Sequence, residues 1–153
     1  MQDPYYQEIM FPEQQSVSLR KVQRDLHREW RVYNHFHDIC ELVIYEAMDG
    51  DVFCDGDVEH IHQGQALFIP PHSIHSFVVR PGRQIYYILH FELSCITRIN
   101  PDFQLPARAL ALELEAADFQ CLLTLLRWCI DTEGYPTALG KGFDLVLSVF
   151  FEK

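Results

Sequence analysis

Three histidines and one glutamate have the types and the spacing of a site for a metal ion or a polar ligand. His35 and His37 are separated by one residue, and Glu41 follows four positions after His37. Residues two and four apart share a face of a continuous strand, so these side chains would point to the same side. His75 comes from a later segment and could meet them inside a barrel. Imidazole nitrogens and a carboxylate oxygen suit a divalent first-row metal, and they can also bind hydroxyl groups.

Short β-strands separated by turns are predicted over residues 19–110, and these strands must position the four side chains. Segments rich in Val, Ile, Phe and Tyr recur at 41–45, 66–69, 76–79 and 84–93. Strong turn signals interrupt them at Asp49-Gly50, Asp55-Gly56, Pro70-Pro71 and Pro81-Gly82. This spacing is typical of a small all-β barrel or sandwich.

Two amphipathic helices are predicted over residues 115–153. Apolar residues recur at helical spacing from Phe119 to Ile130, after a possible N-cap at Asp118, and again beyond a second possible N-cap at Thr137. Four further apolar side chains lie off these stripes: Leu125, Trp128, Leu145 and Phe151. Because this is more apolar surface than one buried face requires, we expect the helical hairpin to join two copies into a homodimer as well as to pack on the barrel.

The composition is that of one soluble globular domain with an acidic surface. Of the 153 residues, 48% are hydrophobic and 22% are charged, and the formal net charge is −10. An acidic surface repels the phosphate backbone of nucleic acids. We therefore expect DNA binding only through a separate basic domain that is absent from this chain.

The cysteines and the start of the chain indicate a cytoplasmic protein. There are five cysteines, an odd number without a CxxC pair, which argues against a disulfide framework and against a thiolate zinc site. The first residues lack the pattern of a signal peptide, and no apolar stretch is long enough to span a membrane. We expect free thiols, a cytoplasmic location and no membrane partner.

Two segments resemble the signature motifs of the cupin family. The first cupin motif has His-x-His followed after three or four residues by Glu, which is the pattern of residues 35–41. The second motif begins with Gly, has Pro six positions later and continues to His, as do Gly64, Pro70 and His75. The resemblance implies a mainly β fold, a cupin barrel (double-stranded β-helix or jelly roll), followed here by the C-terminal α-helical hairpin.

Three positions depart from the cupin motifs. His72 stands where glycine is usual, Val79 where asparagine is usual, and Glu29 where the first motif begins with glycine. These departures count against a catalytic cupin more than against a cupin fold.

The residues around the motifs resemble the N-terminal sensing and dimerisation domain of AraC-type bacterial transcription regulators. The likeness covers almost the whole chain and includes residues 37–42, 64–71 and 86–91. It implies that a small-molecule effector, often a carbohydrate, binds inside the barrel and controls a helix-turn-helix DNA-binding domain. The last residues carry no helix terminator, so we expect that domain to follow Lys153.

Alternation along the strands predicts which side chains face the interior. The predicted ligand-binding residues are His35, His37, Glu41, His75, Phe77, Tyr86, Ile88 and His90, with Val43 on the same inner side. Histidine and glutamate can orient hydroxyl groups, and aromatic rings can stack on a sugar ring. The set is typical of a pocket for a polar ligand with some apolar surface.

Three hypotheses remain open for His35, His37, Glu41 and His75: a metal-free effector pocket, a divalent metal site for Zn, Ni, Fe or Mn, or a hydrogen-bonded cluster without a ligand. The sequence shows no nucleophilic triad, phosphate-binding glycine loop or redox dithiol, so we predict no enzyme and no obligatory cofactor. The alternatives are a metal-dependent cupin enzyme of isomerase or dioxygenase type, and a free-standing sugar-binding cupin.

The first residues are predicted to form an arm. Residues 1–18 are polar and contain Pro4 and Pro12, which favours an extended segment. Its aromatic residues Tyr5, Tyr6 and Phe11 could close over the pocket mouth when an effector binds.

Overall fold

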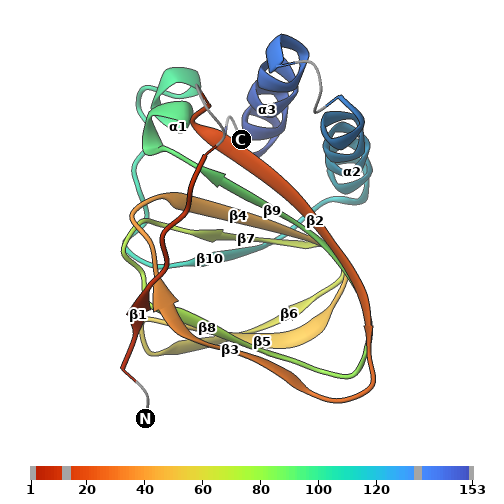
Figure 1. Ribbon diagram of the computed structural model, residues 1–153. Helices are drawn as coiled ribbons and strands as arrows, with labels where there is room; N and C mark the ends of the chain where they lie inside the picture. The colour runs from red at the N-terminus through yellow and green to blue at the C-terminus, as the bar shows by residue number, and fades with distance from the viewer. Residues whose placement is uncertain (1–2, 12–14, 133–135, 152–153) are drawn as a thin grey trace.

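Two five-stranded sheets face each other in the computed structural model, which describes residues 3–11, 15–132 and 136–151 (Figure 1). Sheet A has the strand order β1-β3-β8-β5-β6, and sheet B has the order β10-β7-β4-β9-β2. The strands of sheet A are β1 (Tyr5–Tyr6), β3 (Trp30–Phe36), β8 (His75–Val79), β5 (Asp49–Cys54) and β6 (Asp57–His62). Those of sheet B are β10 (Leu110–Glu113), β7 (Gln65–Ile69), β4 (Cys40–Ala47), β9 (Gly82–Phe91) and β2 (Val17–Leu26). The predicted mainly β jelly-roll fold is confirmed.

Sheet B is covered on its outer face by the helices and faces sheet A with its inner face (Figure 1). Its central strand β4 therefore contributes alternate residues to two cores. Cys40, Leu42 and Ile44 belong to the cluster that includes helix residues. Val43 and Tyr45 belong to the cluster between the two sheets. This alternation follows from the two-residue period of a strand.

Three helices lie in the described part of the chain: α1 (Leu93–Ile99), α2 (Ala116–Asp131) and α3 (Pro136–Phe151). The predicted C-terminal helical hairpin is confirmed as α2 and α3, whereas α1 was not predicted, because the strand that was expected to continue to Leu93 ends at Phe91. Both expected N-caps are wrong. Helix α2 begins two residues before Asp118, so Asp118 lies in the first turn and is not the N-cap. Its negative charge there interacts favourably with the helix dipole. Among the described helices, none is both long and apolar enough to cross a lipid bilayer.

Helix α3 begins at Pro136, so Thr137 lies inside its first turn. Proline suits the first helical position because that position needs no N–H donor. At the other end of α3, the expectation that Phe151 adds to the exposed apolar surface is also wrong. Its ring is buried and lies 5.3 Å from Phe68, 6.2 Å from Phe91 and 5.3 Å from Phe103, measured between ring centroids.

Helices α2 and α3 approach each other closely at Gly142. A Cβ atom placed on Gly142 would lie 2.5 Å from the Cys129 sulfur and 2.7 Å from the Trp128 ring. On the same helix, Gly140 has no heavy atom within 4 Å of such a position. A side chain at residue 142 would therefore force the two helices apart, whereas one at residue 140 would not.

We predict opposite effects of alanine at these two glycines. Gly142→Ala should lower the free energy of unfolding by roughly 1–3 kcal/mol, because an overpacked interface strains the surrounding side chains. Gly140→Ala should raise it by about 0.5–1 kcal/mol, since alanine is the better helix former and meets no obstacle. Urea denaturation of the two variants and the wild type measures both changes. Equal stabilities for the two variants would contradict the close contact between α2 and α3.

Candidate functional site

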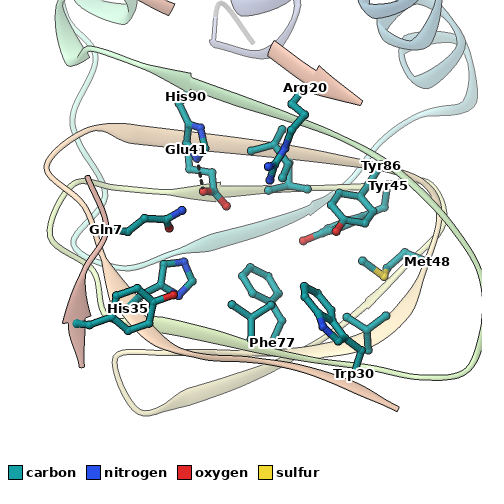
Figure 2. A pocket seen from close by; sticks show the side chains of 15 residues that line it. Gln7, Arg20, Trp30, His35, Glu41, Tyr45, Met48, Phe77, Tyr86 and His90 are labelled. Carbon is teal, nitrogen blue, oxygen red and sulfur yellow. Dashed lines mark hydrogen bonds and ion pairs between the residues drawn. The ribbon is translucent and has the colours of Figure 1, made fainter. Parts of the chain in front are cut away.

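A cavity of about 220 Å³ lies between the inner faces of the two sheets (Figure 2). Six residues that were predicted to bind a ligand line it: His35, Glu41, Phe77, Tyr86, Ile88 and His90. Val43 also lines it. The side of β9 that faces the cavity is therefore the side that strand alternation predicts. Whether these residues contact an effector stays a prediction.

The other two predicted residues, His37 and His75, lie behind this lining. The side chain of His75 is 0% exposed and that of His37 is 1% exposed. Both rings pack against others of the cluster, with centroid distances of 4.1 Å between His35 and His75 and 5.1 Å between His37 and His75. These two histidines are placed to support the cavity wall.

The predicted single strand from His35 to Glu41 is wrong. Strand β3 ends at Phe36 and β4 begins at Cys40, so the chain passes from sheet A to sheet B between them. His37 lies in this turn, where its Nδ1 is 2.9 Å from the carbonyl oxygen of Ile39. The side chains of His37 and Glu41 still converge, because the turn places His37 beside the start of β4 and brings its Nε2 to 3.3 Å from Oε2 of Glu41.

The carboxylate of Glu41 is the polar centre of the site. It is almost fully buried, and its Oε2 lies 2.8 Å from Nε2 of His90 and 3.3 Å from Nε2 of His37. Burial acts to raise the pKa of this carboxyl group, but the contacts with His37 and His90 outweigh burial and hold the pKa well below its usual range. Glu41 is therefore ionised at neutral pH.

Backbone carbonyl groups fix the orientation of three histidine rings. In His35, His37 and His75 the Nδ1 atom lies 2.9 Å from a carbonyl oxygen, that of Tyr33, Ile39 and Ser73, respectively. A carbonyl oxygen only accepts hydrogen bonds, so each Nδ1 carries the hydrogen. In the neutral ring, Nε2 then has a free lone pair.

Burial favours the neutral ring at two of these positions. It lowers the pKa of His75 to about 4 and also lowers that of His35. Nε2 of His75 is buried and has no hydrogen-bond partner among the described residues. At neutral pH, therefore, His35 and His75 each present an Nε2 lone pair and no positive charge.

The contact between His37 and Glu41 requires a proton or another cation. If Nδ1 of His37 donates to Ile39, a neutral ring has no hydrogen left on Nε2 for the carboxylate. Either the His37 ring is protonated on both nitrogens, or a cation lies between Nε2 and Oε2. The ligand atoms of His37, Glu41 and His90 all lie within 4.8 Å of one another, which suits a metal ion. This group differs from the four residues predicted as metal ligands, since it contains His90 and lacks His35 and His75.

His72 stands where the second cupin motif usually has glycine, and its backbone conformation shows why glycine is common at this position. Its φ angle is +67°, in the left-handed region that glycine adopts most readily. The side chain is exposed, and the backbone N–H donates to the carbonyl of His37 at 2.7 Å. His72 thus belongs to the frame that holds His37 and not to the cavity lining.

The predicted arm contributes one aromatic ring to the cavity. Strand β1 pairs in parallel with β3, and the Tyr5 ring stacks on His35 with a centroid distance of 5.6 Å. Tyr5 and Gln7 line the cavity (Figure 2). Tyr6 and Phe11 do not line the cavity in this structure, and their closure over it when an effector binds stays a prediction. Tyr6 lies against Phe36, because alternation turns it to the other side of β1, and Phe11 lines a different hollow near α3.

Six further lining residues were not predicted: Arg20, Trp30, Val32, Tyr45, Met48 and Val79. Arg20 lies on β2, which pairs with β9 in a register that sets Arg20 beside Ile88. Tyr45 shares the inner side of β4 with Glu41 and Val43. For Tyr45 the same alternation was a usable signal, whereas the inward side of β2 becomes evident only from its pairing with β9.

The comparisons with known proteins agree with this geometry. Residues 22–136 match the family model described as the AraC-like ligand binding domain. No curated protein sequence matches the chain.

Two solved structures of ToxT from Vibrio cholerae strain SCE256 have the same fold. The apo form of a ToxT variant superposes with a TM-score of 0.64 at 11% identity, covering 90% of this chain and 59% of that one. Wild-type ToxT bound to an unsaturated fatty acid gives a TM-score of 0.64 at 12% identity, covering 94% of this chain and 56% of that one. The chain therefore spans little more than half the length of these proteins.

Proposed function

The chain belongs to the family of AraC-like ligand-binding domains, and we propose that it binds a small-molecule effector between its sheets to control an attached helix-turn-helix DNA-binding domain. The observation that carries this proposal is the cavity, whose lining combines aromatic and aliphatic side chains with a few polar groups. Such a mixture is typical of sites for small organic ligands. The acidic chain itself is unsuited to bind DNA, with a formal net charge of −10. We expect regulation and not catalysis, in the cytoplasm.

A carbohydrate stays our prediction for the effector class. Trp30, Phe77 and Tyr86 offer aromatic faces to the cavity, and Glu41 and His90 offer polar atoms that can bind hydroxyl groups. The ToxT structure with an unsaturated fatty acid makes an apolar-bodied ligand the alternative. Both classes would use the same aromatic and aliphatic walls.

We predict that a tryptophan at Ile88 prevents effector binding. Candidate neutral sugars, sugar acids and unsaturated fatty acids are screened by thermal unfolding of the wild-type protein. A ligand at a hundredfold excess over its Kd should raise Tm by roughly 5–10 °C. Ile88→Trp should abolish this increase, because the larger ring fills the cavity. Val58→Trp is the matched control, since residue 58 lies on β6 with 57% of its side chain exposed.

An unchanged Tm increase in Ile88→Trp would place the ligand outside the barrel and contradict the proposal. The regulatory half of the proposal is tested by the coding sequence beyond Lys153. It should encode a basic domain with helix-turn-helix segments. A stop codon directly after Lys153 would leave the effector cavity without a DNA-binding partner in the same chain.

The second candidate function is that of a metal-dependent cupin, and the geometry of the cluster of His37, Glu41 and His90 supports it. His37, Glu41 and His90 fit a divalent ion by atom type and by separation. The carbonyl bond that orients His37 is the kind of outer contact that metal-bound histidines make. When bound, such an ion supplies Lewis-acid chemistry. His37, Glu41 and His90 would hold this ion.

The metal-dependent candidate predicts that the affinity for a metal ion depends on His90 and not on the surface histidines. Zinc titrated calorimetrically into chelator-treated protein should bind, and His90→Gln should weaken its affinity by more than about tenfold. His60→Gln is the control, because His60 is exposed on β6. Absence of zinc, nickel, iron and manganese from the purified protein, together with no binding in the titration, would eliminate the metal-dependent candidate.

We propose that the protein forms a homodimer through α2 and α3. Trp128 is 42% exposed and Leu145 is 53% exposed, and Leu125 is half-buried. Large apolar side chains on neighbouring helices are typical of a surface that a second copy covers. Phe151 does not contribute, because it is buried in the aromatic cluster.

We predict that Leu145→Glu weakens this dimer. Each copy would bring a charge into an apolar contact, so the dissociation constant should rise by at least about tenfold. Analytical ultracentrifugation over a concentration series measures it. Leu105→Glu is the control, because Leu105 is 42% exposed but lies outside the helices. A monomeric wild type, or equal effects of the two substitutions, would contradict dimerisation through α3.

A further inference from the structure

One arginine directs an uncompensated charge into the cavity. Arg20 is an exposed residue that lines the cavity from β2, and its side chain points toward the cavity (Figure 2). Six other arginines of the described chain donate hydrogen bonds to side chains: Arg24, Arg31, Arg80, Arg98, Arg108 and Arg127. Within the described residues, Arg20 makes no hydrogen bond or ion pair. The same is true of Arg28 and Arg83, but neither of these lines the cavity.

The one acid that shares the inner face of sheet B with Arg20 has other partners. Glu41 is the one acidic residue among the described residues that line the cavity, and its carboxylate contacts His37 and His90. No ion pair links Glu41 to Arg20 in the described structure. The positive charge of Arg20 is therefore not neutralised by the cavity wall.

Two tyrosines on the same sheet as Arg20 have hydroxyl groups that can each donate a further hydrogen bond. Tyr45 is 1% exposed, and its hydroxyl is buried without a partner among the described residues. The Tyr86 hydroxyl accepts a hydrogen bond from Nη2 of Arg24 at 3.0 Å, which leaves its own hydrogen free to donate. Burial raises the pKa of both tyrosines, so each keeps its hydrogen at neutral pH.

We infer that the effector carries an acidic group, a carboxylate in the simplest case, which binds to Arg20 and receives hydrogen bonds from Tyr45 and Tyr86. This inference rests on the proposed effector-binding function and names the chemistry of the ligand. A guanidinium and two hydroxyl donors match the acceptor oxygens of a carboxylate, and an anion neutralises the charge that the protein leaves unpaired. The remainder of the ligand lies against the apolar and aromatic wall that includes Trp30 and Phe77.

The acidic group can belong to a fatty acid or to a sugar acid. Pairs of probes, each an acid and its amide, distinguish these two classes. Octanoate is compared with octanamide, and glucuronate with glucuronamide, so that each pair differs in charge but hardly in shape. Isothermal titration calorimetry at low salt measures each Kd for the wild type, Arg20→Gln, Arg20→Lys and Arg83→Gln. Residue 83 is the control because it is exposed, unpaired in the described structure and outside the cavity.

At least one acid should bind the wild type, and its amide should bind about tenfold more weakly or worse. Arg20→Gln should weaken binding of the acid roughly ten- to a hundredfold, as expected for loss of a hydrogen-bonded charge, and should leave the amide unchanged. Arg20→Lys should retain part of the affinity, and Arg83→Gln all of it. The acid that binds identifies the source class.

Three results would overturn the inference: equal affinities for acid and amide, an unchanged acid Kd in Arg20→Gln, or no binding of either acid at millimolar concentration. An amide that binds as tightly as its acid, and that Ile88→Trp excludes, would reject the acidic group while keeping the effector cavity. Failure of Ile88→Trp to exclude any bound probe would instead reject the proposed function itself.

Discussion

The burial of β4 on both faces is the constraint on which the rest of the structure depends. Leu42 and Ile44 pack in the layer beneath the helices, while Glu41 and Val43 face the cavity. A slip of one residue would put the carboxylate into the helix layer and a leucine into the cavity, so the apolar core fixes the register. The fixed register pairs Glu41 with His90 on β9 and thereby creates the polar centre of the site.

A buried carboxylate is stable only when donors or cations surround it, and this requirement organises the histidines. Two of the rings contact Glu41, and His35 and His75 pack beside them with their Nδ1 atoms held by backbone carbonyls. The rings are therefore oriented before any ligand or ion arrives. Such preorganisation lowers the entropic cost of binding, whichever occupant the cavity takes.

Local patterns predicted the fold and the inner faces of β4 and β9, because alternation and the motif spacing are properties of neighbouring residues. They failed where the outcome depends on distant segments. The spacing predicts a continuing strand at His37, where the structure has a turn, although it correctly predicts that His37 and Glu41 converge. The helical pattern predicts Phe151 as exposed apolar surface, whereas the rings of Phe68 and Phe103 pack against it. Arg20 carries no local signal, because exposed arginines are common and Arg20 is itself exposed, and only the pairing of β2 with β9 shows that it lies on the cavity side.

The same sheet that lines the cavity also contacts α2, which gives the proposed effector a physical route to the helices. Tyr86 faces the cavity, while its neighbour Tyr87 faces the helix layer and donates to Oε2 of Glu46 at 3.0 Å. Arg127 of α2 donates to the other oxygen of Glu46 at 2.8 Å. Because Tyr86 and Tyr87 share one close-packed strand, we propose that a ligand that moves the Tyr86 ring also perturbs the bridge to α2. Switching then requires only that the ligand bind one arrangement of this bridge more tightly than the other.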